Sequence, residues 1–133
     1  MTNDMKLGFI DYYLDEWHAN NYPKLFADAS DGEVVVGSAY GMIASPRTGM
    51  TSEQWCENFG VKHAATIEQV IEENDCMVVL SPDNPEMHPE LCKLSLASGK
   101  RTYIDKTFAP DFATARRIFD IANSHGTKLF SSS

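Results

Sequence analysis

A chain of 133 residues, 43% of them hydrophobic and 23% charged, has room for one globular domain with its own core and not for two. Its net charge of −8 argues against nucleic acid and membranes as partners, because nucleic acid and anionic membranes both bind basic surfaces; plain solubility accounts for the charge. No apolar run approaches the roughly 18 residues of a membrane span, and a polar N-terminus and three cysteines without a CxxC pair indicate a reducing cytoplasm.

The N-terminal part of the chain predicts two strands joined by a helix. Residues 6–10 form a short apolar run typical of a first strand, and residues 16–29 follow as a helix. Pro23 lies inside that helix, so we expect the helix to kink or restart there. An Asp-Gly turn then leads into a second strand over residues 33–38, rich in β-branched side chains. The apolar residues expected on the buried face of the helix are Trp17, Leu25 and Phe26.

A loop and a short helix follow the second strand. Residues 39–50 contain two glycines and a proline and are expected to form the loop. The helix covers residues 52–58, with Thr51 or Ser52 as its cap and Gly60 as its end.

The middle of the chain predicts a third and a fourth strand. Residues 61–64 form a brief strand at most. Thr66 and Gln69 have the spacing of a capping box, which begins a helix. Residues 76–80 are a continuous apolar run, typical of a strand buried on both faces. The apolar residues that share one face of the intervening helix are Ile67, Val70 and Ile71.

The remaining residues continue the alternation. Pro89 suits the first turn of a helix over residues 89–98, which carries Leu91, Leu94 and Leu96 and ends at Gly99. Residues 101–104 predict a strand, residues 111–125 a helix, and residues 127–130 a last short strand. The residues expected on the buried face of that last helix are Phe112, Ala115, Ile118, Phe119 and Ala122.

Strands that alternate with helices across short connections indicate βαβ units. We therefore expect an α/β fold: a doubly wound, mostly parallel sheet of about six strands in a three-layer α/β/α arrangement of the NAD(P)-binding Rossmann type. The expected strand order is 3-2-1-4-5-6, with a very short third strand.

In such a sheet, ligands bind beyond the carboxyl ends of the strands, near the point where the strand order reverses. The candidate binding residues are therefore those that directly follow each strand. They are Asp11, Tyr12 and Tyr13; Ser38, Ala39 and Tyr40; Ser81, Pro82, Asp83 and Asn84; and Asp105, Lys106 and Thr107.

The first turn lacks the glycines that let a backbone approach a pyrophosphate. Its acidic residues Asp11, Asp15 and Glu16 bring negative charge to the phosphate position instead. A like-charge pair about 4 Å apart costs about 1 kcal/mol in water and about 4 kcal/mol near a protein surface. A helix N-terminus stabilises a bound anion by only about 0.3–1 kcal/mol. We expect weak NAD(P) binding by this chain, although Asp15 as a helix cap and Asp11 as a turn former are equally good interpretations.

After the second strand, an acid would normally bind the ribose hydroxyls of NAD. Ser38 and its neighbours offer hydroxyl groups and no acid. Ser45, Arg47 and Thr48 could meet a 2′-phosphate, which would favour NADP, and ordinary solvated loop residues account for them as well.

Lys106 follows the fifth strand directly. An ammonium group at a buried strand end is costly to desolvate without a partner, and Asp105 could be that partner or face the other way along the pleat. An exposed loop lysine is the simpler alternative.

The C-terminal half contains a Ser-Pro pair after a buried strand, His88, a Gly-Lys pair at a helix end and an Asp-Lys-Thr run after the next strand. With these features it resembles the Gfo/Idh/MocA family of oxidoreductases. In that family a buried strand ends in Thr-Pro and is followed by an Asn and a His, a helix ends in Gly-Lys, and the next strand ends in Glu-Lys-Pro. The matching segments here are Val78-Val79-Leu80-Ser81-Pro82, then His88, then Ser98-Gly99-Lys100, and Ile104-Asp105-Lys106-Thr107.

The resemblance implies a Rossmann domain coupled to a C-terminal α+β domain that this chain lacks. Family members pass hydride between NAD or NADP and a sugar, inositol or similar hydroxyl. By resemblance, Lys106 matches the catalytic lysine, and Asp105 matches the family glutamate. Thr107 replaces the family proline, and Asp11, Tyr12 and Tyr13 lie at the cofactor turn. The segment that would line the nicotinamide contains Ser81, Pro82, Asn84 and His88. His18 lies near a position where many members carry histidine, and a half-buried helix residue is the alternative; His63 and His125 read as surface residues.

The leading hypothesis is the N-terminal nucleotide-binding domain, residues 1–133, of an NAD(P)-dependent oxidoreductase that binds a small-molecule substrate. This fragment alone would be inactive, and the missing domain would form any homo-oligomer. The alternative is a non-catalytic Rossmann-like scaffold whose degenerate turn binds another small ligand or none. Lys106 favours the first hypothesis, and the Asp-Tyr-Tyr turn favours the second. An assembly module that contacts partners through a sheet edge has no specific support.

Overall fold

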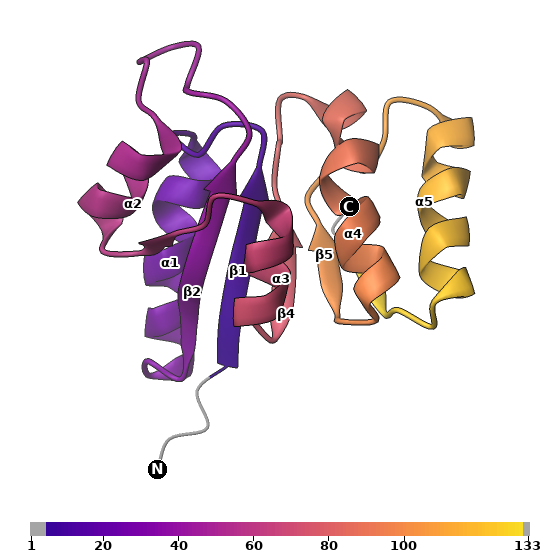
Figure 1. Cartoon of the computed structure of the whole chain (residues 1–133), viewed down its shortest axis with the longest axis horizontal. Coiled ribbons are helices and arrows are strands. Elements are labelled where there is room, and N and C mark those ends of the chain that lie inside the picture. Colours follow the sequence, from indigo (N-terminus) through magenta and orange to yellow (C-terminus); the bar gives the residue numbers. More distant parts are fainter. Residues whose placement is uncertain (1–4, 132–133) are drawn as a thin grey trace.

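The computed structural model describes residues 5–131 as strands that alternate with helices (Figure 1). In chain order the elements are β1 (Met5–Asp11), α1 (Trp17–Ser30), β2 (Val34–Gly41), α2 (Ser52–Phe59), β3 (Lys62–His63), α3 (Ile67–Glu73), β4 (Cys76–Val79), the 3-10 helix η1 (Pro85–Met87), α4 (His88–Ser98), β5 (Thr102–Ile104), α5 (Phe112–Ser124) and β6 (Leu129–Ser131).

The strands form one six-stranded sheet in the order β3-β2-β1-β4-β5-β6. Every neighbouring pair is parallel, and β3 pairs through only two residues. The predicted α/β fold, strand order and short third strand are confirmed. Because the order reverses beside β1, the carboxyl ends of β1 and β4 border the place where ligands bind in this class of sheet.

Helices cover both faces of the sheet, and each face has its own apolar core. In Figure 1, α3 and α4 lie in front of the sheet and α1 lies behind it. The core beneath α3, α4 and α5 includes Val70, Val79, Leu91, Leu96, Ile104 and Ile118. The core beneath α1 and α2 includes Leu7, Phe9, Leu14, Ala19, Trp55 and Leu80.

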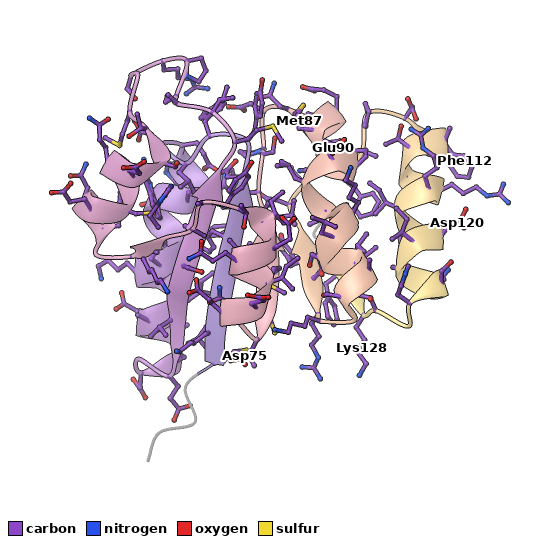
Figure 2. The ribbon with its side chains drawn as sticks, in the orientation of Figure 1. Asp75, Met87, Glu90, Phe112, Asp120 and Lys128 are labelled. Atoms are coloured by element: carbon purple, nitrogen blue, oxygen red, sulfur yellow. The ribbon has the colours of Figure 1, made fainter. Side chains whose placement is uncertain are left out.

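Four of the apolar residues predicted to be buried are exposed. Trp17 and Leu25 on α1 are 63% and 52% exposed. On α5, Phe119 is 49% exposed, and Phe112, at the start of the helix, is 81% exposed (Figure 2). Leu25 lines an open apolar hollow of about 470 Å³ that α1 shares with β1, β4, β5 and β6. Helical periodicity gives the direction of an apolar stripe, but not how far the neighbouring elements extend over it.

Local chemistry sets most helix ends. Thr51 and Gln54 form a capping box at the start of α2, and Gly60 ends that helix in the left-handed conformation, with φ 65°. Thr66 caps α3 by accepting the N–H of Gln69, while the Gln69 side chain reaches the N–H of Ala65. The helix α1 runs through Pro23 without restarting.

The second strand is longer than the predicted 33–38. It extends to Gly41 because Ala39, Tyr40 and Gly41 continue the pairing with β1. The carboxyl end of β2 therefore lies three residues beyond Ser38, which moves the expected ligand edge of this strand to residues 42–45. Among residues 5–131, no helix has the length and apolar character needed to cross a membrane.

Candidate functional site

The first turn is held by the side chain of the residue that ends β1. Asp11 Oδ1 accepts the backbone N–H of Ser81 at 2.9 Å and that of Tyr12 at 2.8 Å. Ser81 is the second residue after β4 and has a φ of 60°, a conformation that non-glycine residues rarely adopt. Two backbone donors at the strand-order reversal therefore point at a carboxylate of the protein itself.

Glu16 occupies the N-terminus of α1 in a similar way. Its Oε1 accepts the N–H of Ala19 at 2.9 Å, and the residue is only 6% exposed. The N-terminus of the first helix is where a Rossmann fold binds phosphate, through free backbone N–H groups and the helix dipole. Here a glutamate carboxylate already accepts from that helix end.

The carboxyl groups of Asp11 and Glu16 face one another inside the protein. Burial raises the pKa of Asp11 well above its usual range, and the charge of Glu16 raises it further. Burial also raises the pKa of Glu16, while hydrogen bonds from Asp11 and from the start of α1 act in the opposite direction. Two ionised carboxylates cannot hydrogen-bond to each other, so this pair is joined only when one of them carries a proton.

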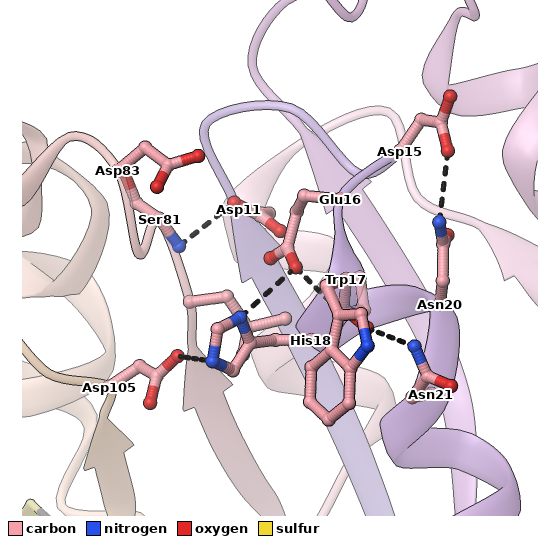
Figure 3. A network of polar contacts seen from close by, with 12 residues as sticks. Asp11, Asp15, Glu16, Trp17, His18, Asn20, Asn21, Ser81, Asp83 and Asp105 are labelled. Atoms are coloured by element: carbon pink, nitrogen blue, oxygen red, sulfur yellow. Dashed lines mark hydrogen bonds and ion pairs between the residues drawn. The ribbon is translucent and has the colours of Figure 1, made fainter.

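His18 connects this pair to the end of β5. Its Nδ1 lies 3.5 Å from Glu16 Oε1, and its Nε2 lies 3.6 Å from Asp105 Oδ2 (Figure 3). Asp105 is 2% exposed, and its other oxygen accepts the Tyr103 hydroxyl at 3.4 Å. Asp11, Glu16, His18 and Asp105, called the acidic cluster below, thus extend from the first turn to the residue before Lys106.

Side chains from two other loops close over the first turn. The Tyr13 hydroxyl donates to Asp83 Oδ2 at 3.3 Å, and Arg47 Nη2 contacts the same oxygen at 2.9 Å. Thr48 Oγ1 donates to Asp15 Oδ2 at 2.7 Å. The loops after β1, β2 and β4 are therefore tied together directly above the strand ends. The pKa of Tyr13 is raised, first by burial and then by the charge of Asp83.

The residues predicted to bind the ribose hydroxyls or the 2′-phosphate of the cofactor form hydrogen bonds within the protein instead. Ser38 is fully buried within β2 and accepts the Asn74 side-chain N–H at 2.7 Å. Its placement at a ligand edge is therefore corrected, because β2 continues past it. Ser45 is also buried, and its Oγ accepts the backbone N–H groups of Arg47 and Thr48.

The segment after β4 is similarly engaged with the protein. Ser81 Oγ donates to the carbonyl of Asn84, and the Asn84 amide donates to Glu86. Pro82 lies between them, half-buried. His88 is fully buried, with Nδ1 at 2.8 Å from the Phe108 carbonyl and Nε2 at 2.5 Å from the Leu80 carbonyl. Both ring nitrogens of His88 thus join β4 to the loop after β5, which leaves neither free to contact a ligand.

Lys106 follows β5 at the same edge of the sheet, and its side chain is exposed. Its orientation toward Ser81 and Asn84 stays a prediction. The other lysine of the resemblance, Lys100, has a structural role: its ammonium donates to the carbonyls of Ile71 and Asn74 at 2.5 and 2.9 Å. These carbonyls lie at the carboxyl-terminal end of α3, where a cation is favourable.

The described conformation of the first turn does not fit the pyrophosphate of NAD or NADP. The amide donors that such a group needs already serve Asp11 and Glu16, and the side chain of Tyr13 in the same turn is only 6% exposed and donates to Asp83 in the loop after β4. Within residues 5–131, no group of three His, Cys, Asp or Glu side chains has the arrangement of a metal site. What the site contains is a set of facing carboxyl groups, a histidine between two of them, and an exposed lysine nearby.

A model of the oxidoreductase family with the NAD-binding Rossmann fold (GFO_IDH_MocA) matches residues 28–133. The first strand and the acidic turn precede the matched residues, which agrees with the unusual chemistry of that turn. A search of curated proteins found no matching relative.

Solved structures with the same fold are longer than this chain. The WlbA dehydrogenase from Chromobacterium violaceum, solved with NADH and UDP-GlcNAcA, is 14% identical with a TM-score of 0.76 over 98% of this chain and 35% of its own. Biliverdin reductase from Synechocystis, solved with biliverdin and NADP+, is 15% identical with a TM-score of 0.72 over 96% of this chain and 37% of its own. KijD10, a 3-ketoreductase from Actinomadura kijaniata, is 20% identical with a TM-score of 0.71 over 98% and 37%. The chain spans little more than a third of these proteins.

Proposed function

Because this chain belongs to the Gfo/Idh/MocA family of oxidoreductases, we propose that it forms the nucleotide-binding domain of a longer NAD(P)-dependent oxidoreductase. The substrate class we propose is a sugar, inositol or similar small molecule with a hydroxyl or carbonyl group to be oxidised or reduced. Structural neighbours solved with UDP-GlcNAcA and NADH, or with a TDP compound and NADP, support this class. A cytoplasmic location and a homo-oligomer formed through a second domain stay predictions.

The observation that carries the proposal is the position of Lys106. It is the second residue after β5, at the carboxyl edge of the sheet, and it is exposed, while the preceding Asp105 is buried against His18. An ammonium at this edge donates hydrogen bonds to a substrate oxygen as negative charge develops on it. Lys106 is therefore the catalytic residue of the proposal.

The proposal assigns no chemical step to the dinucleotide, because the first turn does not fit it in the described conformation. NAD and NADP both remain candidates. The ion pair of Arg47 with Asp83 weakens the argument for NADP, since it engages the only guanidinium of that loop.

A second candidate function follows from the occupied turn. Asp11 and Glu16 accept the hydrogen bonds that a cofactor phosphate would accept, as expected of a family member that keeps the fold and has lost dinucleotide binding. Such a protein would be a scaffold that binds another small ligand or none.

One experiment separates the two candidates. The longer protein is incubated with NAD or NADP and a panel of sugars and inositols, and nicotinamide absorbance is followed together with cofactor binding. Turnover supports the oxidoreductase. Absence of both turnover and cofactor binding supports the scaffold.

A further inference from the structure

Unpaired buried polar atoms are concentrated in the acidic cluster. Within residues 5–131, five buried side-chain nitrogen or oxygen atoms have no hydrogen-bond partner, and four of them belong to this cluster. They are Asp11 Oδ2, Glu16 Oε2, His18 Nδ1 and Asp105 Oδ2. Buried polar groups without partners are strongly unfavourable, so a set of four in one place indicates that something satisfies them.

Two protons suffice to satisfy all four atoms. One proton between the facing carboxyl groups of Asp11 and Glu16 turns two acceptors into a donor and an acceptor. A second proton makes His18 an imidazolium, which forms ion pairs with Glu16 through Nδ1 at 3.5 Å and with Asp105 through Nε2 at 3.6 Å. The three carboxyl groups and the imidazole then carry a net charge of −1 in place of −3.

We propose that Asp11, Glu16, His18 and Asp105 form a proton-binding site that holds two exchangeable protons and keeps the first turn closed. Asp11 and Glu16 share one proton, and His18 carries the other between Glu16 and Asp105. The proton on His18 reaches solvent directly, because this imidazole is 30% exposed while the side chains of Glu16 and Asp105 are 3% exposed.

The neighbouring titratable groups do not supply either proton. From α1 and β5, Tyr22 and Tyr103 face the cluster; the carboxylates of Asp105 and Glu16 add to the burial that raises the pKa of Tyr22 to about 12, so it stays a neutral phenol. Across the crevice, Tyr13 donates to Asp83 and not to Asp11. From the loop after β4, the backbone N–H of Ser81 donates to Asp11. The raised pKa values of Asp11 and Glu16 agree with a proton that the pair retains.

This inference is independent of the proposed enzymatic reaction, and it is tested on the 133-residue chain without cofactor. Carbon-detected NMR follows the carboxyl signals of Asp11, Glu16 and Asp105 and the imidazole signals of His18 as the pH is raised from about 3 to 9. The expected result is that one signal of the Asp11–Glu16 pair keeps shifting well above about pH 5, past the ordinary values near about 4 for Asp and Glu.

The variant His18→Gln tests whether His18 is coupled to the Asp11–Glu16 pair. It should change the titration of Glu16, on which the charge of His18 acts, whereas His125→Gln, at an exposed histidine at the end of α5, should not. Ordinary titration of both Asp11 and Glu16 near about pH 4 would overturn the proposal. Identical carboxyl titrations in His18→Gln and the wild-type chain would also overturn it.

Discussion

The side chain of Asp11 accepts the backbone N–H of Ser81 at 2.9 Å and so joins the ends of β1 and β4, which are neighbours in the sheet but 70 residues apart in the chain. At this junction a dinucleotide-binding protein would expose free backbone donors. Here a carboxylate accepts from them, and Glu16 accepts from the start of α1. The turn therefore has its own negative groups in the place of a ligand's phosphates.

Stability should depend on pH through Asp11. Its pKa is raised in the folded state, so the folded chain binds more protons than the unfolded chain between the unfolded and folded pKa values, and Asp11 favours folding as pH falls through that window. The Asp11→Asn variant should lose this contribution, up to about 1.4 kcal/mol per pH unit. Urea unfolding at pH 7, 6 and 5 measures it. Asp15, whose pKa is lowered, is ionised in both the folded and the unfolded chain at these pH values, so Asp15→Asn serves as the control and should keep the wild-type pH slope. A slope in Asp11→Asn equal to that of the wild-type chain would contradict the assignment.

Removing the negative charge that Asp11 and Glu16 carry at the turn should strengthen dinucleotide binding. In Asp11→Asn/Glu16→Gln the side chains keep their shape, and the repulsion of a phosphate, about 1 to 4 kcal/mol per close pair, is removed. We expect NADH to bind at least about 10-fold more tightly than to the wild-type chain, as measured by calorimetry. Asp28→Asn, which removes an exposed charge on α1, serves as the control. Unchanged affinity in the double variant would mean that these charges do not limit binding.

We expect Lys106 to affect the rate of catalysis and not the affinity for the cofactor. In the longer oxidoreductase, Lys106→Ala should lower kcat by about 100-fold or more and leave cofactor affinity within a few-fold, because its hydrogen bond strengthens as charge develops on the substrate oxygen. Steady-state kinetics and cofactor titration provide both values, and Lys128→Ala controls for the loss of an exposed lysine. A variant with the wild-type rate would return Lys106 to the role of a surface residue.

Lys100 is expected to affect stability. Its ammonium donates to two carbonyls at the end of α3, so Lys100→Met should lower the free energy of unfolding by about 1–2 kcal/mol. Chemical denaturation compares it with Lys128→Met. If both variants unfold at the same denaturant concentration, the contact of Lys100 with α3 does not contribute to the free energy of unfolding.

Local patterns predict much of the fold. The parallel strand order follows from alternating strands and helices, and Thr51 and Gly60 bound α2 because cap chemistry acts within a few residues. The absence of glycine from the first turn is likewise visible in the residues themselves. The exposure of Trp17 and Phe112 could not be predicted in this way, because it depends on which elements extend over each helix.

The site is less predictable than the fold. Ser38 and His88 look like ligand-facing polar residues at strand ends, yet each is fully buried, with Asn74 or two carbonyls as partners that only the tertiary structure reveals. The acidic cluster has no sequence signature, since Glu16 and Asp105 both lie next to His18 only because the sheet brings the first turn close to the end of β5. A histidine two residues after a glutamate is a weak signal by itself.

The central claim is that the first turn already contains its own anions and therefore binds a dinucleotide poorly. Calorimetric titration of the chain with NADH and with NADPH at pH 7 tests it most directly. The account predicts dissociation constants well above about 1 μM for both, a binding free energy weaker than about −8 kcal/mol. A dissociation constant near or below about 1 μM for either cofactor would contradict it.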